Sequence, residues 1–135
     1  MAASSIMSVK EQDQKVCQAA DKFCKLFYEA FDKRRQAVSK MYTDAACMVW
    51  NGNGVSGRTE IDAFINSLPP SEFRLKSVDS QAVDDKITEG TSTIVLMVAG
   101  SVRFESRWHN FSQTFILTAE GDVWKIASDR FRFLN

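Results

Sequence analysis

The stretch from Phe111 to Phe133, FSQTFILTAEGDVWKIASDRFRF, decides the fold class of this chain. Both halves are rich in β-branched and aromatic residues, which favour strands. Glu120-Gly121-Asp122 between them has the composition of a tight turn. The stretch therefore predicts two strands, Phe111 to Ala119 and Val123 to Phe133, that pair as antiparallel neighbours.

Two further strands with the same composition precede this pair, from Phe73 to Val83 and from Thr91 to Glu105. The turn signals Asp84-Asp85 and Ser106 to Asn110 separate these strands from each other and from the pair that follows. Four strands joined by short connections predict an antiparallel sheet.

A shorter hairpin lies further upstream. Ala46 to Trp50 is expected to be a buried strand, and Val55 to Gly57 a short return strand. Asn51-Gly52-Asn53-Gly54 joins them, and Asn and Gly tolerate the positive φ angles that tight hairpins require.

Helical spacing dominates the rest of the chain. From Glu11 to Phe31 the apolar residues recur in steps of three and four, which predicts an amphipathic helix. A shorter helix around Val38 to Tyr42 follows, and a third from Arg58 to Leu68 ends at Pro69-Pro70. The stripe of the first helix consists of Val16, Ala20, Phe23, Phe27 and Phe31.

These elements predict an α+β fold, with helices followed by a long antiparallel sheet. The length of 135 residues fits one domain, which we expect over residues 10–135, preceded by a disordered tail over residues 1–9. The polar N-terminus lacks the apolar core of a signal peptide, and no apolar run reaches membrane-spanning length. We therefore expect a soluble intracellular protein.

Strand alternation predicts an outer sheet face that could bind a partner. In the last strand Phe131 and Phe133 share the face toward the helices, which leaves Arg130 and Arg132 on the other. Large apolar groups mixed with Arg are typical of protein interfaces, and a solvated face with snorkelling arginines is the alternative. The residues assigned to partner binding are Arg132, Arg130, Asp79, Gln81, Gln113 and Phe115.

The sequence offers little catalytic or metal-binding chemistry. His109 is the only histidine and is expected in an exposed turn. Tyr42 and Asp44 could form an acid–base pair in an apolar pocket, but a packed Tyr at a helix end with a solvated Asp is the simpler interpretation. We expect no cofactor, no metal and no catalytic residue. The three cysteines lack a CxxC pair and metal-ligand spacing, which indicates reduced thiols.

The charge balance disfavours direct binding to nucleic acid or membranes. Lys plus Arg and Asp plus Glu both number 17, so the formal net charge is zero. A basic cluster, Lys33-Arg34-Arg35 with Lys40, could contact phosphates or act as an import signal. We interpret it as a solvated helix junction.

The chain resembles the nuclear transport factor two superfamily, and within it the small subunits that pair with the messenger-RNA export receptor. The resemblance spans nearly the whole chain from Glu11. Among the segments that carry it are Asp32-Lys33-Arg34-Arg35, Val49-Trp50-Asn51-Gly52-Asn53, Phe115-Ile116-Leu117-Thr118-Ala119 and Val123-Trp124-Lys125-Ile126-Ala127-Ser128-Asp129 followed by Phe131-Arg132-Phe133.

The resemblance implies a cone-shaped domain in which three helices pack against a strongly curved sheet. It implies a non-enzymatic adaptor that heterodimerises through the outer sheet face with the similar domain of the large export receptor. Arg132 would form an ion pair across that dimer, whereas Arg130 replaces a residue that is usually small or apolar. The protein would act in the nucleus and at the nuclear pore, shuttle to the cytoplasm, and meet nucleoporins indirectly.

Two alternatives remain within this superfamily. A homodimeric relative imports GDP-bound Ran, which it holds with acidic residues. At the matching positions this chain has Asn51 and the stretch Phe104-Glu105-Ser106-Arg107, which should weaken contact with a cationic partner. The other alternative is a dehydratase or isomerase with its active site in the cone cavity.

Overall fold

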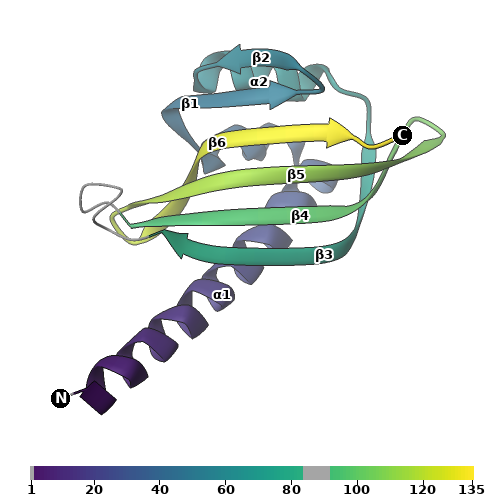
Figure 1. The fold of residues 1–135 in the computed structure, drawn as a ribbon. Coiled ribbons are helices and arrows are strands. Elements are labelled where there is room, and N and C mark those ends of the chain that lie inside the picture. The colour runs from purple at the N-terminus through teal and green to yellow at the C-terminus, as the bar shows by residue number, and fades with distance from the viewer. Residues whose placement is uncertain (1, 84–91) are drawn as a thin grey trace.

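The computed structural model describes residues 2–83 and 92–135, with backbone alone for residues 2–12. It confirms the α+β class: an α-helix α1 (Ala2–Lys33), a 3-10 helix η1 (Arg35–Met41) and an α-helix α2 (Arg58–Ser67) pack on one sheet (Figure 1). The strands are β1 (Tyr42–Trp50), β2 (Asn53–Ser56), β3 (Ser71–Val83), β4 (Thr93–Phe104), β5 (Arg107–Glu120) and β6 (Val123–Phe133).

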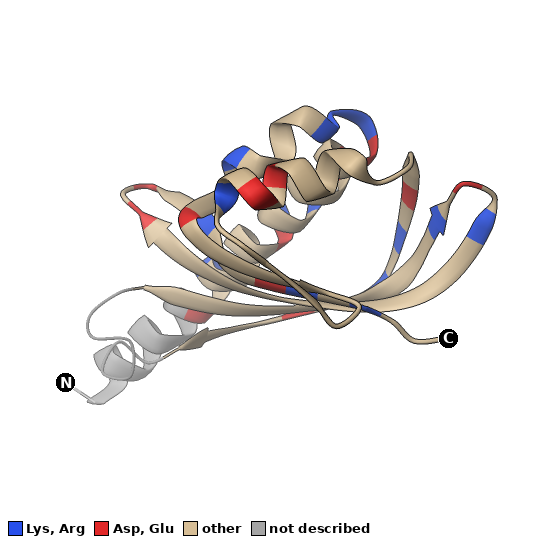
Figure 2. Ribbon diagram, turned by 90° about the horizontal axis from the view of Figure 1, so that it is seen from above, with Lys and Arg blue, Asp and Glu red and all other residues tan. Residues whose placement is uncertain are grey.

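The sheet has six strands in the order β2-β1-β6-β5-β4-β3. All neighbours are antiparallel except β1 and β6, which run parallel. The sheet is thus mixed rather than wholly antiparallel. Its strands bend toward the side that carries the helices (Figure 2), so the face away from the helices is the outer face.

Helix α1 is longer than the sequence pattern predicts. It begins at Ala2, inside the segment 1–9 for which we expected a disordered tail, and Met1 lies outside the described residues. No Gly or Pro occurs between Ala2 and Lys33 to interrupt the helix. A domain boundary at residue 10 stays a prediction.

Aromatic side chains fill the space between α1 and the sheet. Phe23, Phe27 and Phe31 of the predicted stripe are buried. The Phe27 ring packs edge-on against Phe115 with centroids 5.0 Å apart, and Trp50 stacks on Phe131 at 3.8 Å. Such ring pairs add about 0.5–1.5 kcal/mol each to the burial of apolar area.

Three local predictions were wrong. The second helix is a 3-10 helix, and Tyr42 begins β1 instead of ending that helix. His109 lies in β5, stacked on the Phe133 ring at 4.2 Å, because the β4–β5 turn is confined to Glu105-Ser106, where Glu105 adopts a positive φ of 58°. Asp84-Asp85 and Thr91 lie outside the described residues.

The short hairpin is confirmed. Asn51 and Gly52 form its turn with φ angles of 48° and 85°, as the sequence predicts. Two-residue turns with positive φ at both positions match the twist of paired strands. The turn also touches β6, because the Asn51 Oδ1 accepts a hydrogen bond from the Phe133 N–H at 2.8 Å.

Arg35 was assigned to a solvated basic cluster, but it binds the loop that follows α2. Its guanidinium donates to the carbonyl oxygens of Leu68 and Pro69, both at 2.9 Å. It also donates to the carbonyl oxygens of Phe31 and Ile65 and to the Ser71 hydroxyl. The planar fork of donors fixes the end of α2 beside the end of α1.

Replacing Arg35 with lysine is expected to lower the free energy of unfolding by about 2 kcal/mol. A lysine keeps the charge but cannot reach this set of acceptors, so partly buried carbonyls lose their partners. Urea denaturation followed by circular dichroism measures the change. The matched control is Arg34→Lys, because Arg34 is exposed. Equal stability of the two variants would contradict the structural role of Arg35.

Candidate partner-binding interface

The register of the sheet defines the residues of the outer face. Asp79 pairs with Met97, Met97 with Thr114, and Thr114 with Arg130. Directly paired residues point to the same side of a sheet. Leu96 and Phe115, which neighbour members of this row in sequence, are fully buried, so the row faces away from the helices.

Arg130 and Arg132 lie on this face, as strand alternation predicted. Both side chains are exposed, and neither has a hydrogen bond or ion pair with any other residue that the structure describes. Arg132 pairs in register with Ser112 and Arg130 with Thr114, so the two cations stand side by side along β6. The sheet therefore presents two free guanidinium groups.

Large apolar side chains share this face with the two arginines. Met97 is 44% exposed and Ile116 40% exposed, and both point outward from the central strands β4 and β5. Asp79 and Gln81 of β3 are also exposed and share this face. Their placement is as expected, and their contact with a partner stays a prediction.

Gln113 and Phe115 do not lie on the outer face, and this placement was wrong. Gln113 is 2% exposed and Phe115 is fully buried. In register they pair with Phe131 and Asp129, which point toward α1. Because Gln113 and Phe115 alternate with outward residues of β5, both must face the core.

Gln113 belongs to a buried hydrogen-bond network. The Tyr28 hydroxyl donates to Gln113 Oε1 at 2.6 Å, and Gln113 Nε2 donates to Asp129 Oδ1 at 2.8 Å. The Tyr42 hydroxyl donates to Asp129 Oδ2 at 2.6 Å. The network joins α1 to β1, β5 and β6, and every described buried side-chain polar atom in the protein has a partner.

Burial governs the acidity of this network. It raises the pKa of Asp129 to about 6, although the bonds from Tyr42 and Gln113 oppose the rise. Burial also raises the pKa of Tyr28 and Tyr42 well above its ordinary value. Tyr42 and Asp129, whose oxygen atoms lie 2.6 Å apart, are the residue types that can act as general acid and base.

The surroundings of the network leave no room for a substrate. The Phe27 ring lies 5.1 Å from Tyr28 and 6.4 Å from Tyr42, and Phe115 packs against Tyr28 at 6.4 Å between centroids. Tyr42 and Asp129 are at most 1% exposed. The network therefore ties elements together rather than facing a cavity.

The acid–base pair considered from the sequence is not brought together. The Asp44 side chain is 86% exposed and pairs with Arg58 at 2.6 Å, while the Tyr42 hydroxyl binds Asp129. Sequence reasoning missed Asp129. Strand alternation could have identified it: Asp129 shares the inward face of the last strand with Phe131 and Phe133, and an acid at a core position is unusual.

The described residues show no other site of this kind. No three described His, Cys, Asp or Glu side chains lie close enough to hold a metal ion. Cys17, Cys24 and Cys47 are free thiols. Among the described residues, no helix has both the length and the apolar character needed to cross a bilayer.

Comparison with known proteins agrees with the fold. The model of the nuclear transport factor 2 (NTF2) domain matches residues 19–133. NTF2-related export protein 2 from Homo sapiens is 40% identical over 132 residues, which cover 94% of this chain and 93% of the relative.

Solved structures repeat the architecture. Nuclear transport factor 2 from Cryptosporidium parvum has a TM-score of 0.78 and 25% identity, over 88% of this chain and 94% of that one. A complex of Mtr2 with the Mex67 M domain from C. albicans matches with a TM-score of 0.71 over 89% and 96% of the two chains. Its 16% identity shows a shared fold. This chain belongs to the nuclear transport factor 2 domain family.

Proposed function

We propose that this protein is a non-enzymatic nuclear export adaptor that heterodimerises, through its outer sheet face, with the similar domain of the messenger-RNA export receptor. The observation that carries the proposal is the pair of free guanidinium groups, Arg130 and Arg132, beside exposed Met97 and Ile116. The 40% identity to an NTF2-related export protein supports an export role. The fold shared with the Mtr2–Mex67 complex supports pairing with a receptor domain.

The charges of the outer face favour a different partner over a second copy. In a symmetric homodimer the same patch meets itself, so an excess of one sign is repelled. The excess here is positive, and it favours a partner with acidic groups. The outward cations are Arg74, Arg103, Lys125, Arg130 and Arg132, against the anions Glu72, Asp79 and Glu120.

Such an adaptor would work in the nucleus and at the nuclear pore, shuttle to the cytoplasm, and reach nucleoporins through the receptor. Ran binding is disfavoured because the Asn51 side chain, at the position where an acid would hold Ran, instead accepts the Phe133 N–H. The rings packed around the Asp129 network support a non-enzymatic role, because they occupy the place where a cavity enzyme needs its substrate.

Arg132→Asp is expected to abolish binding to the receptor domain, because the new carboxylate would face an acidic residue of the partner and repel it. The fold should stay intact, because Arg132 is exposed. Co-expression with that domain, followed by mass measurement of the purified complex, gives the result. A receptor domain whose acidic residue opposite Arg132 is changed to Arg should restore the complex. Arg34→Asp is the matched control, since Arg34 is exposed near the helices and carries the same charge change.

An Arg132→Asp variant that still binds the receptor domain like wild type would remove Arg132 from the interface. Failure of the wild-type chain to form any complex with the receptor domain, together with a stable homodimer that retains Ran, would instead favour the import-carrier alternative.

A further inference from the structure

A cluster of side chains that contact one another lies on the outer face beyond the two free arginines. Arg103 of β4 pairs in register with Glu72 of β3 and with Trp108 of β5. Arg74, two residues after Glu72, points to the same side. This Trp108 cluster, defined as Glu72, Arg74, Arg103 and Trp108, lies at the end of β4 and the start of β5, next to the turn that joins them.

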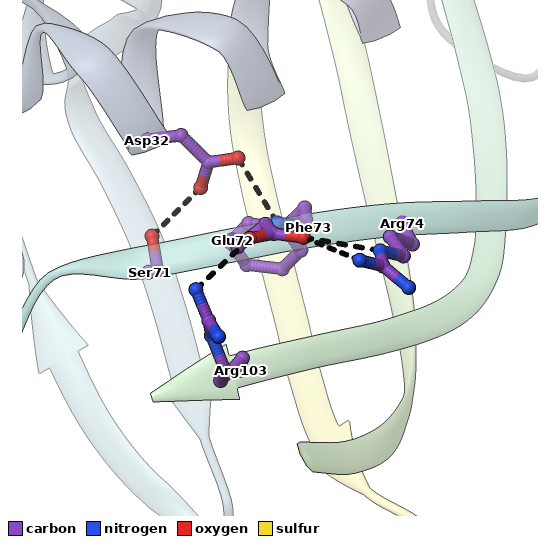
Figure 3. Close-up of polar contacts among 6 residues, drawn as sticks. All are labelled: Asp32, Ser71, Glu72, Phe73, Arg74 and Arg103. Carbon is purple, nitrogen blue, oxygen red and sulfur yellow. Dashed lines mark hydrogen bonds and ion pairs between the residues drawn. The ribbon is translucent and has the colours of Figure 1, made fainter. Parts of the chain in front are cut away.

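The cluster is held together before any partner arrives. The two Glu72 oxygens bind one guanidinium each, Arg74 at 3.0 Å and Arg103 at 3.0 Å (Figure 3). Both guanidiniums lie over the Trp108 ring, at 4.5 Å and 5.6 Å from its centroid. Side chains that already hold one another in place lose less freedom when a partner covers them.

The core does not account for the exposure of Trp108. Its side chain is 40% exposed, whereas Trp50 is 6% exposed. Trp and Arg are the residues that most often dominate binding energy at protein interfaces. An indole framed by two guanidiniums on a sheet face is therefore a candidate anchor for another protein.

The position of Trp108 is continuous with the interface proposed above. Ser112 pairs with Arg132, and Trp108 lies four residues earlier on the same strand and face. That spacing corresponds to roughly 14 Å at the rise of a β-strand. A standard interface buries about 800 Å² per partner, which is a disc of about 16 Å radius. A partner centred on Arg132 therefore reaches Trp108.

The charges of the cluster indicate what it binds. Two guanidiniums and one carboxylate leave it with one net positive charge. A single-stranded nucleic acid fits less well, because stacked bases need an open ring face, and Arg74 lies over the indole and leaves only part of it exposed. An apolar side chain next to a carboxylate would meet both the indole and the guanidinium edges.

We propose that the Trp108 cluster is a second anchor of the heterodimer, at which the receptor domain places an apolar side chain flanked by a carboxylate. This inference rests on the proposed function. It separates the interface into a charged centre at Arg132 and an aromatic anchor at the β4–β5 end.

The test is the affinity of purified variants for the receptor domain, measured by calorimetry. Trp108→Ala is expected to weaken binding at least about 30-fold, with a melting temperature close to that of wild type because Arg74 and Arg103, which lie over the ring, are exposed side chains. Leu26→Ala is the control, since Leu26 is 54% exposed and lies on α1. It should bind like wild type.

Tryptophan fluorescence tests whether Trp108 is covered in the complex without removing the Trp108 ring. In a Trp124→Phe background the exposed indole is Trp108, because Trp50 is buried. Adding the receptor domain is expected to shift its emission to shorter wavelength and to protect it from acrylamide.

Three outcomes would overturn the inference. The first is Trp108→Ala binding within twofold of wild type while Arg132→Asp does not bind, which leaves the proposed function standing. The second is emission that does not change in the complex. The third is a polyuridine oligonucleotide that binds wild type but not Trp108→Ala, combined with equal affinity of the two proteins for the receptor domain. Loss of the proposed function itself would appear separately, as failure of the wild-type chain to bind the receptor domain.

Discussion

Replacing Gly100 with alanine is expected to lower the free energy of unfolding by at least about 3 kcal/mol. A Cβ at this position would collide with the backbone carbonyl oxygen of Arg74 and lie 3.0 Å from the Cα atom of Leu75. These atoms belong to β3, whose register against β4 shifts between Leu75 and Ser77. Because the obstacle is backbone, no rotamer change can relieve it.

Urea denaturation of Gly100→Ala, followed by circular dichroism, tests the close approach of β3 and β4. Gly54→Ala is the matched control, since a Cβ there meets no atom within 4 Å. The control should stay within about 0.5 kcal/mol of wild type. If Gly100→Ala were as stable as Gly54→Ala, the two strands could not lie as close as the structure has them.

The second large effect concerns Asp129 and pH. Burial raises its pKa in the folded protein to about 6, from an ordinary value of 3.8. The folded state therefore binds the proton more tightly than the unfolded state. This stabilisation is complete below about pH 4 and is lost as pH rises through about 6, by up to about 3 kcal/mol.

Asp129→Asn removes this titration and keeps the size of the side chain. Relative to this variant, the wild-type free energy of unfolding is expected to fall by about 2.4 kcal/mol between pH 4 and pH 7. Groups elsewhere contribute equally to both proteins, so the difference isolates Asp129. Asp44→Asn is the control, because the Asp44 side chain is 86% exposed. Parallel pH profiles for wild type and Asp129→Asn would show that the carboxyl is not desolvated.

Local patterns predicted most elements of the fold because each had a local cause. The Phe stripe of α1, the Asn51-Gly52 turn and the stop at Pro69 act over a few residues. The parallel pairing of β1 with β6 has no such local signal, since the two strands are far apart in the chain. We therefore predicted a wholly antiparallel sheet, and nothing local in the sequence indicated the parallel pair.

The outward residues of the candidate interface were predicted correctly in β6 but not in β5. Alternation along β6 placed Arg130 and Arg132 correctly because Phe131 between them marks the core side. In β5 the polar Gln113 suggested an outward face, and its buried partners Tyr28 and Asp129 come from distant elements. Alternation also fails at Ile126, which is buried because a register shift inserts Ala127 between it and Ser128.

The Trp108 cluster could not be predicted, because its cause is a pairing between strands. Glu72, Arg103 and Trp108 meet through register alone. Trp108 was also assigned to a turn that proved to be shorter, which hid its outward direction along β5.

The parallel pairing of β1 with β6 has a consequence for how the chain is made. A ribosome releases the N-terminal end first, so α1 and β1 emerge long before β6, which must lie between β1 and β5 to complete the sheet. Until β6 has left the exit tunnel, β1 lacks the strand that joins it to the rest of the sheet, and Trp50 lacks the Phe131 ring on which it stacks. Contacts between distant segments also slow folding. The sheet therefore cannot close until its last strand in chain order is made, and that strand carries Arg130 and Arg132.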